Sequence, residues 1–517
     1  MAKFYRVTKY LAALSLVFFL AGCSTSSKQT QEFKPTKFET ADVVVIGGGG
    51  AGMAAAVEAV TGGAKVIVLE KADVLGGNTN FAEGIFGVES SLQKALGIKV
   101  NLNQMLRTEY EFQNYKINSK LWELVGRKSA DTIEWLLGLG VDFATVSSPG
   151  GGEKTWHVYA DADGHEHGAA MIYRLQQKFE SMGGKIMYST PGVGLVYENG
   201  KITGVNAIDK NNTQILINTK VAVIATGGFG ANEEMVRELT TFDTSQLTYR
   251  GTPGMTGDGI NMAVKIGAYL DKNSTISAIG LTLPGSTLFS PMSVSASMEP
   301  TNIWINQDAE RYVHEDVAFI YTLGANAIQT QQKTFSVYDS NSLKRFMEQG
   351  VLLGWGVFVQ PGQKLPDLQK EVDAAIASGN PRVFKADTLE QLAEEMGLDK
   401  ARFVSTVNNY NSFCDNGEDL DYGKDKAFLV PVKQPPFYGF HISAVNLNSM
   451  GGLRINIKGE VLNDKFEPMS GLYAAGMDVS GFTGETYGMV LPGSCQGIAV
   501  NTGRLCAESA LAYIGKK

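Results

Sequence analysis

The residues most indicative of chemistry stand near the N-terminus, where a glycine pattern is followed by an acid. Gly47, Gly49 and Gly52 are spaced Gly-x-Gly-x-x-Gly directly after the valine-rich run 41–46, and Glu70 follows 18 residues after Gly52. Glycines at this spacing let the backbone approach a pyrophosphate, and an acid at this distance binds ribose hydroxyls. The pattern therefore predicts a dinucleotide-binding site.

A strand–helix–strand unit must position these residues. The run 41–46 is rich in valine and isoleucine, as expected of a buried parallel strand, and 65–69 is a second such run that ends at Glu70. The alanine-rich stretch 53–61 between them predicts a helix. The N-terminus of this helix would face the glycine turn, where its dipole stabilises phosphate charge. Strand, helix, strand and acid in register favour ligand binding over a purely structural glycine turn.

Composition sets limits on the fold and on its partners. The chain has 517 residues, of which 44% are hydrophobic and 19% charged, so it is globular and long enough for about two to four domains. Its 59 glycines are not periodic, so we expect them in turns and at close backbone approaches. The net charge is −8 and no basic block is present, which argues against nucleic acid as a partner.

The first residues predict export. A basic start precedes an apolar run at 11–20, which is too short for a membrane span. Leu-Ala-Gly-Cys follows, ending at Cys23, and closely resembles a bacterial lipobox. We therefore expect a lipoprotein signal peptide over 1–22, a lipid on Cys23 and a polar tether over 23–39. The expected location is extracytoplasmic, lipid-anchored to the bacterial membrane; the alternative is a plain signal peptide with a chance cysteine.

The other cysteines and the histidines indicate neither haem nor metal. Cys414, Cys495 and Cys506 are odd in number and define no disulfide framework. The sequence has no Cys-x-x-Cys-His and no Cys or His cluster with metal-ligand spacing. His165 and His167 alone make an improbable zinc pair. We expect no metal.

Further segments extend the dinucleotide pattern. They are Leu-Gly-Gly-Asn-Thr-Asn at 75–80, an apolar strand at 221–225 that leads into Thr-Gly-Gly-Phe at 226–229, and Gly-Leu-Tyr-Ala-Ala-Gly at 471–476. With the first glycines, they resemble the flavoprotein subunit family of fumarate reductase and succinate dehydrogenase. Within this family, the sequence most resembles the branch of the soluble flavocytochrome c fumarate reductases, urocanate reductase and the 3-ketosteroid dehydrogenases. The resemblance covers about residues 40–515. It implies one FAD, expected to bind non-covalently because no flavin-transferase acceptor motif is evident.

The resemblance implies an α/β fold in which a Rossmann-like FAD-binding domain carries an inserted α+β capping domain. We expect the FAD-binding domain over 40–274 and 439–517, and the capping domain, which is also the substrate domain, over 275–438. Within the cap, 389–398 and 400–411 are typical of helices. A cap that closes on the flavin would exclude water during hydride transfer.

Cofactor contacts of the family can be carried over residue by residue. The family's ribityl-binding glutamate is Met477 here, and we expect the adjacent Asp478 to substitute for it. Cys495 opens a helix expected over 498–513, where it would either have a lowered pKa or serve as a small packing residue. The predicted cofactor-binding residues are Gly47, Gly49, Gly50, Ala51, Gly52, Glu70, Lys71, Gly76, Gly77, Asn78, Thr79, Val193, Thr226, Gly227, Gly228, Asp258, Gly476, Asp478, Gly493, Ser494 and Cys495.

The family's proton donor is an arginine in the cap, and this chain lacks it. The motif Arg-Tyr-Val-His-Glu at 311–315 resembles the stretch that precedes the arginine. Counted without a gap the donor falls on Phe319, and with a two-residue insertion it falls on Tyr321. A phenylalanine cannot move a proton, so we favour Tyr321, with Glu315 or His314 as its relay to solvent.

The family's carboxylate ligands are also replaced. Asn448 stands where the family has a histidine, and Val490 where it has a clamping arginine. The segment 278–282 lacks the family's other histidine. An uncharged site cannot offset the desolvation of a dianion, so fumarate and succinate are unlikely substrates.

Tyr487 offers a different polar group. Tyr487-Gly488 resembles a segment of the 3-ketosteroid dehydrogenases in which the tyrosine hydrogen-bonds a substrate carbonyl. Such a bond lowers the barrier to hydride addition at a conjugated alkene. The alternative is a core tyrosine that bonds backbone.

Three functions are compatible with these observations. The first is a reductase of an activated C=C bond, an enoate or enone, that serves as an electron acceptor in anaerobic respiration. The second is a dehydrogenase that introduces a C=C bond, and the third is a flavin-loaded lipoprotein that relays electrons without turnover. With one dinucleotide fingerprint and no haem motif, the reductase needs an external donor: a cytochrome, an FMN protein or a quinol-linked membrane protein.

Membrane attachment is expected to depend on Cys23, because the lipobox places the lipid on its thiol. Cys23→Ser should release the protein from the membrane or leave an unprocessed precursor, as cell fractionation would show. Metabolic lipid labelling that persists in the variant would contradict the lipobox interpretation.

Overall fold

The computed structural model describes residues 33–148, 153–356 and 358–516. The predicted signal peptide, the predicted lipidation site Cys23 and most of the predicted tether lie outside these residues. Within the described ranges, no helix is both long and apolar enough to cross a lipid bilayer.

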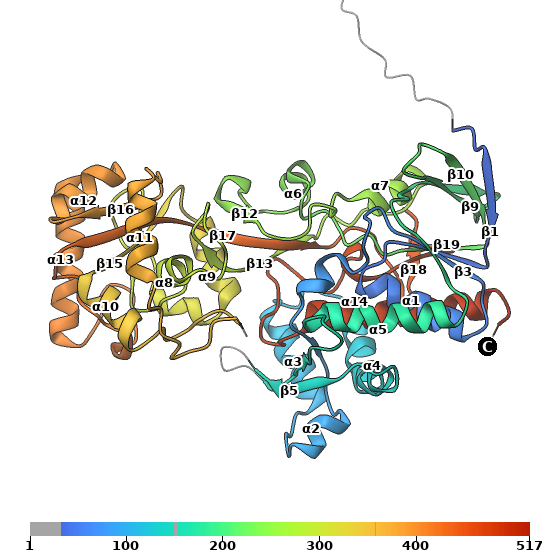
Figure 1. Cartoon of the computed structure of the whole chain (residues 1–517), viewed down its shortest axis with the longest axis horizontal. Coiled ribbons are helices and arrows are strands. Elements are labelled where there is room, and N and C mark those ends of the chain that lie inside the picture. The colour runs from blue at the N-terminus through green and yellow to red at the C-terminus, as the bar shows by residue number, and fades with distance from the viewer. Residues whose placement is uncertain (1–32, 149–152, 357, 517) are drawn as a thin grey trace, which may run out of the picture. The chain divides into compact units, whose positions relative to one another are not determined.

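A mostly parallel sheet carries the glycine turn (Figure 1). Its strands are β1 (Lys37–Thr40), β2 (Val43–Ile46), β3 (Val66–Leu69), β7 (Lys185–Met187), β8 (Gly192–Glu198), β9 (Lys201–Ile208), β10 (Gln214–Asn218), β11 (Val221–Ile224), β18 (Glu460–Leu462) and β19 (Pro468–Ala474). They are ordered β1-β10-β9-β19-β11-β2-β3-β7, with β8 on β9 and β18 on β19. Every residue of β2, β3 and β11 is apolar and buried, as expected where helices or other layers cover both faces.

Two helices pack directly on each other beside this sheet: α1 (Gly50–Thr61) and α14 (Ser494–Tyr513). They touch at Gly503, where a Cβ would stand 2.2 Å from the carbonyl oxygen of Ala51. Only glycine allows this approach, which holds the N-termini of both helices at the same cavity.

Strand β17 (Phe437–Met450) belongs to a second sheet and links its two halves (Figure 1). The other strands are β12 (Leu247–Tyr249), β13 (Thr275–Thr282), β14 (Ile303–Asn306), β15 (Thr334–Asp339) and β16 (Val383–Ala386). The first residues of β17 pair with β15 and β16, and its last residues pair with β12 and β13. The predicted domain boundary after residue 438 falls inside this strand, and the domain limits stay a prediction.

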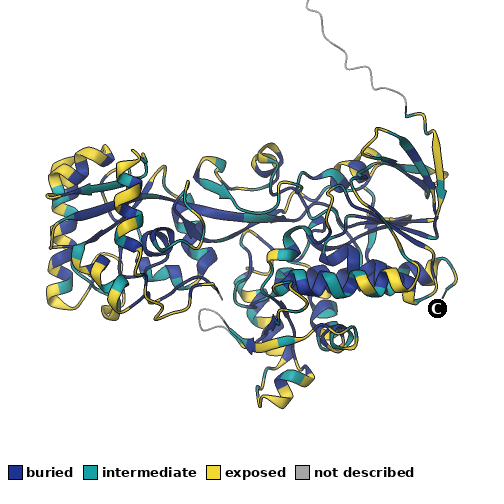
Figure 2. Cartoon of the chain, in the orientation of Figure 1, coloured by how far each residue is buried: buried dark blue, intermediate teal, exposed yellow. Residues whose placement is uncertain are grey.

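The remaining elements surround these sheets. In the predicted FAD-binding domain they are η1 (Gly77–Phe81), β4 (Gly84–Phe86), α2 (Ser91–Ala95), α3 (Leu102–Phe112), α4 (Ser119–Gly138), β5 (Phe143–Ser147), β6 (Trp156–Tyr159), α5 (His167–Ser181), α6 (Glu233–Leu239) and α7 (Asp258–Lys265). In the predicted cap they are α8 (Pro291–Ser297), η4 (Glu315–Phe319), α9 (Tyr321–Gln329), α10 (Ser340–Glu348), α11 (Leu368–Ala377), α12 (Leu389–Met396) and α13 (Lys400–Asn416). Figure 2 shows exposed outer faces on α11, α12 and α13 and buried strands between them.

Helices start earlier than the sequence pattern predicted. The helix expected over 53–61 begins at Gly50, inside the glycine run, and the helix expected over 498–513 begins at Ser494. In both, a glycine is the N-cap, and the small residues of the first turn lie against the cavity. The hydrophobic pattern starts only where the helix meets the core, so it underestimates the length.

Candidate active site

A cavity of about 730 Å³ opens where the parallel strands end. Ile46, Leu69 and Ala225, at the C-terminal ends of three neighbouring strands, line it together with the glycine turn. Ligands of α/β sheets bind at this edge, and a small-molecule site typically measures about 300–1,000 Å³. The cavity continues from the glycine turn to residues of the predicted cap.

The glycines of the first turn have different roles. A Cβ on Gly47 would stand 2.2 Å from the carbonyl oxygen of Ala225, and one on Gly52 would stand 1.9 Å from that of Gly47. These two glycines are therefore required by the fold itself. A Cβ on Gly49 would meet only the carbonyl oxygen of Gly76, at an ordinary 3.5 Å, so the space beside Gly49 is free for a ligand.

Glu70 and Lys71 hold the other side of this space. The Glu70 carboxylate accepts hydrogen bonds from the amides of Gly48 (2.9 Å) and Ala72 (2.8 Å). It is buried and lines the cavity, which suits an acid that binds ribose hydroxyls. Lys71 forms a 2.6 Å ion pair with Asp258, and both also line the cavity.

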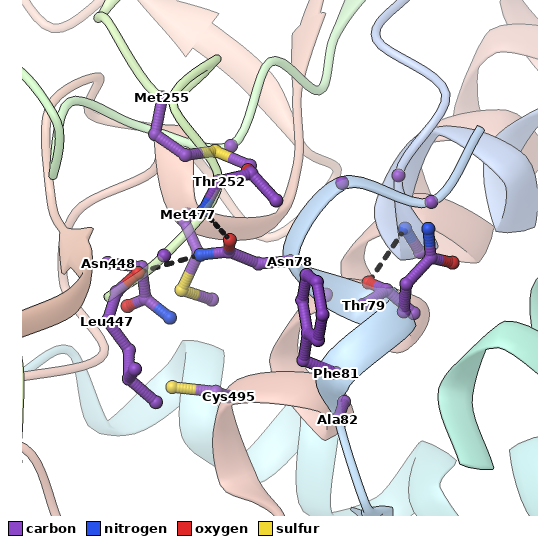
Figure 3. Close-up of a pocket in the computed structure, with 18 of the residues that line it drawn as sticks. Asn78, Thr79, Phe81, Ala82, Thr252, Met255, Leu447, Asn448, Met477 and Cys495 are labelled. Carbon is purple, nitrogen blue, oxygen red and sulfur yellow. Dashed lines mark hydrogen bonds between the residues drawn. The ribbon is translucent and has the colours of Figure 1, made fainter. Parts of the chain in front are cut away.

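Asn78 and Thr79 tie the cavity wall together (Figure 3). The Asn78 amide donates to the carbonyl of Leu447 at 2.8 Å and accepts from the amide of Thr252 at 2.7 Å. The Thr79 hydroxyl accepts from the amide of Gly50 at 3.1 Å. These hydrogen bonds hold segments that are far apart in the sequence around the same cavity.

Asp478 lies behind the wall rather than in it. Its carboxylate accepts hydrogen bonds from the Thr226 hydroxyl (2.8 Å) and from the amides of Gly227 (2.9 Å) and Gly228 (3.0 Å). Burial raises the pKa of Asp478, and these donors oppose the rise. The neighbouring Met477 faces the cavity, so Asp478 shapes the loop that lines the site and does not replace the family's ribityl ligand.

Most of the predicted cofactor residues are brought to one cavity. Those that line it are Gly47, Gly49, Gly50, Ala51, Glu70, Lys71, Gly76, Gly77, Asn78, Thr79, Thr226, Gly227, Asp258, Gly476, Gly493 and Cys495. Those that do not are Gly52, Val193, Gly228, Asp478 and Ser494. Val193 is exposed, whereas its neighbours Pro191 and Gly192 line the cavity.

This wall fits FAD. It has a backbone cradle open at Gly49, a buried acid at Glu70 and the amino ends of α1 and α14 at one cavity. Helix N-termini and open glycines stabilise a pyrophosphate, and a helix N-terminus also stabilises a reduced, anionic flavin.

Aromatic rings form the end of the cavity that belongs to the predicted cap. Phe289 stacks on Phe358 with centroids 4.2 Å apart, and Trp355 lies 5.9 Å from Phe289 and 5.5 Å from Tyr321. All of these rings line the cavity. The sequence patterns did not single out Phe289, Trp355 or Phe358, because they belong to irregular segments without a motif.

The structure distinguishes between the two candidates for the proton donor. Tyr321 lines the cavity at the N-terminus of α9, whereas Phe319 packs on Phe428, with centroids 5.1 Å apart, and is not part of the wall. Burial raises the pKa of Tyr321 to about 12, so the phenol keeps its proton at neutral pH.

Tyr487 also lines the cavity. Its hydroxyl accepts hydrogen bonds from the Ser494 hydroxyl (3.0 Å) and from the amide of Cys495 (3.3 Å), at the N-terminus of α14. Both bonds use the phenol oxygen as acceptor, so its own proton can be donated to a ligand. Burial raises the pKa of Tyr487 well above its usual value. Burial likewise raises the pKa of Cys495, to about 11, which favours a packing role over a reactive thiolate.

Glu315 does not reach the cavity. It is fully buried in the cap, where it pairs with Arg311 at 2.8 Å and with Lys424 at 3.1 Å, and Arg311 also pairs with Asp419 at 2.9 Å. These cations keep the pKa of Glu315 low against the effect of burial. The cluster is balanced in charge and has a structural role, so the catalytic role predicted for Glu315 does not fit its position.

Asn448 places an uncharged amide in the cavity wall, at the position where the family has a histidine. Its side chain lies beside Met477, Leu447 and Cys495 (Figure 3). Its Oδ1 is buried and has no hydrogen-bond partner among the described residues. An unpaired buried acceptor is costly, so this oxygen is suited to a ligand donor. Val490 is not part of the wall, although its neighbour Met489 is.

The comparisons agree with this site. A family model described as an FAD binding domain matches residues 42–488. A vinyl phenol reductase of Lactiplantibacillus plantarum is 38% identical over 92% of this chain and 97% of its own length. An NADH:fumarate oxidoreductase of Klebsiella pneumoniae is 28% identical over 86% of this chain, which spans 45% of that relative. The open conformation of a flavocytochrome c3 fumarate reductase has a TM-score of 0.70 at 26% identity, covering 93% of this chain and 79% of that one.

Fold, cavity and relatives together define a flavoprotein oxidoreductase. The chain belongs to the fumarate reductase and succinate dehydrogenase family of flavoproteins. Its cofactor is FAD, and it is an oxidoreductase that acts on C=C bonds. The predictions of family, fold class and cofactor are confirmed.

The loop that carries Tyr487 rests on a buried acid of α3. Gln113 donates to the Glu109 carboxylate at 2.8 Å and accepts from the amide of Gly484 at 2.7 Å. Glu109 packs so tightly that a Cβ on Gly488 would stand 2.3 Å from its Oε1. Its Oε2 has no partner among the described residues, and burial raises the pKa of Glu109 to about 7.

Cofactor binding is expected to fail in Gly49→Val while the fold survives, because Gly49 has extended φ and ψ angles and free space beside it. Flavin per protein should fall at least ~10-fold, with a normal far-ultraviolet spectrum. Gly52→Ala is the contrasting variant, since its Cβ clashes with backbone and should unfold the protein. A fully yellow Gly49→Val would show that the pyrophosphate lies elsewhere.

Glu109→Gln is expected to stabilise the protein in a pH-dependent way. Glu109 ionises near 4.5 when unfolded and near 7 when folded, so the free energy of unfolding falls as pH rises through that window. Relative to wild type, the variant should gain up to roughly 3 kcal/mol at about pH 8 and little at about pH 5. Denaturant unfolding measures this, with the exposed Glu111→Gln as control. An equal gain at both pH values would contradict the buried-acid account.

Proposed function

We propose that this protein is an extracytoplasmic, lipid-anchored reductase of neutral aryl alkenes, of which a hydroxystyrene is the simplest. The aromatic wall carries the proposal: rings occupy the cap end of the cavity, and the uncharged Asn448 and Tyr487 supply its polar contacts. Aromatic walls favour a flat apolar substrate, and the replacement of the family's carboxylate-binding histidine and arginine by Asn448 and Val490 disfavours a dicarboxylate. The 38% identity to a vinyl phenol reductase supports the same class.

Bound FAD, once reduced, supplies a hydride from its N5. The protein's own side chains bind the substrate and supply the proton. Phe289 and Trp355 hold the substrate ring and keep water out. Asn448 accepts a hydrogen bond from a hydroxyl of the substrate, and Tyr487 donates one to an oxygen. Tyr321 gives its phenolic proton to the alkene carbon that does not take the hydride.

The proposed physiological role is that of an electron sink in anaerobic respiration. A lipid on Cys23 would keep the protein on the outer side of the membrane, where NADH is absent. Electrons then come from a cytochrome, an FMN protein or a quinol-linked membrane protein. The neighbouring genes would show which of these donors accompanies it.

Tyr321→Phe is expected to slow alkene reduction without affecting the cofactor, because the ring packing is kept and only the donated proton is lost. FAD content and reduction by dithionite should stay unchanged, while reoxidation by hydroxystyrene falls ~100-fold, the scale of a general acid. Tyr115→Phe, which alters an exposed tyrosine, is the matched control. Undiminished turnover in Tyr321→Phe would exclude it as the proton donor.

A further inference from the structure

Tyr321 needs a source of protons. After it has given its proton to an alkene it is a phenolate in a buried site, and burial raises its pKa to about 12, so the phenolate must recover a proton before the next turnover. The relay groups expected from the motif do not serve this need. Glu315 is held by Arg311 and Lys424, and His314 is bonded to Asp316 at 2.5 Å.

Glu83 lines the cavity from outside the predicted cap. It stands in the turn between η1 and β4, close to the predicted cofactor residues Asn78 and Thr79 in sequence, and lines the same cavity as Tyr321. Its side chain is half-buried. The glycine fingerprint gives this position no role.

The carboxylate of Glu83 meets the cap at Gly356. A Cβ on Gly356 would stand 2.7 Å from both Oε1 and Oε2 of Glu83, so the carboxylate lies directly over this glycine. Gly356 has a φ of +52°, in the left-handed region that favours glycine. The contact therefore joins the two walls of the cavity at a position where a side chain has no room.

Gly356 also contacts Tyr321. Its backbone hydrogen-bonds the phenol, and the charge of Glu83 acts on the same phenol to raise its pKa. The loop is held from behind by Glu299, which accepts hydrogen bonds from the amides of Leu352 (2.8 Å) and Leu353 (3.3 Å). Glu83, Gly356 and Tyr321 thus form a continuous group whose position is fixed on both sides.

We propose that Glu83 is the acid that returns a proton to Tyr321 after each turnover. In this step the O–H bond of the protonated Glu83 breaks and the O–H bond of Tyr321 forms. Glu83 then takes a proton from water, which its half-exposed side chain can reach. The step transfers only a proton, so it needs no oxidant or reductant. The proposal rests on the proposed reduction of an alkene.

The relay predicts a difference between the first turnover and the later ones. In pre-reduced Glu83→Gln, Tyr321 already carries its proton, so one pulse of hydroxystyrene should reoxidise the flavin at the wild-type rate. Under steady reduction by dithionite, turnover should fall ~10- to 100-fold, because each cycle waits for a proton from water. Added formate or imidazole should restore it in proportion to concentration, and Glu83→Asp should restore part of it.

Controls separate the relay from a structural role. The exposed Glu234→Gln should behave as wild type, and FAD content should be normal in every variant. In a Tyr321→Phe background, Glu83→Gln should add nothing, since both act on one step.

Three results would overturn the relay: an equally slow first turnover, unchanged steady turnover, or no response to added acid. Wild type that reduces another alkene but not hydroxystyrene refutes the proposed substrate class, and the same series on that alkene then decides the relay. Wild type that reduces no alkene refutes both.

Discussion

The site depends on the register of one strand. β17 is hydrogen-bonded to the cap strands β15 and β16 over its first residues and to β12 and β13 over its last, so it holds both walls of the cavity in one ladder. The register of β17 decides which of its residues reach the cavity. Leu447 and Asn448 line it, whereas Ser449 accepts a hydrogen bond from the amide of Phe229.

Several buried acids stand behind the walls of the cavity and support its loops. Glu109 supports the loop of Tyr487, Glu299 supports the loop of Trp355, and the cluster around Arg311 braces the cap. Burial raises the pKa of both Glu109 and Glu299 to about 7; Gln113 opposes the rise at Glu109, and Arg345 together with the amides of Leu352 and Leu353 opposes it at Glu299. The cap end of the cavity is rich in aromatic rings, and Asn448 and Tyr487 are among its polar groups.

The sequence was sufficient for parts of the site that are local in the chain. Gly49 and Glu70 follow from one strand–helix–strand unit, whose geometry is set by backbone sterics. The choice between Phe319 and Tyr321 depended on an insertion that a single sequence does not fix, and only packing resolves it. Glu83 was missed because its contact with Gly356 joins segments far apart in the chain, and neither residue belongs to a motif.

The central claim is that this flavoprotein reduces a neutral aryl alkene rather than a dicarboxylate. The most direct measurement is anaerobic stopped-flow reoxidation of the dithionite-reduced protein by hydroxystyrene and by fumarate, at equal concentrations. We expect hydroxystyrene to reoxidise the flavin at least ~100-fold faster, because loss of charge-assisted bonds to each carboxylate removes roughly 1.5–3 kcal/mol apiece. Reoxidation by fumarate at an equal or higher rate would contradict the account.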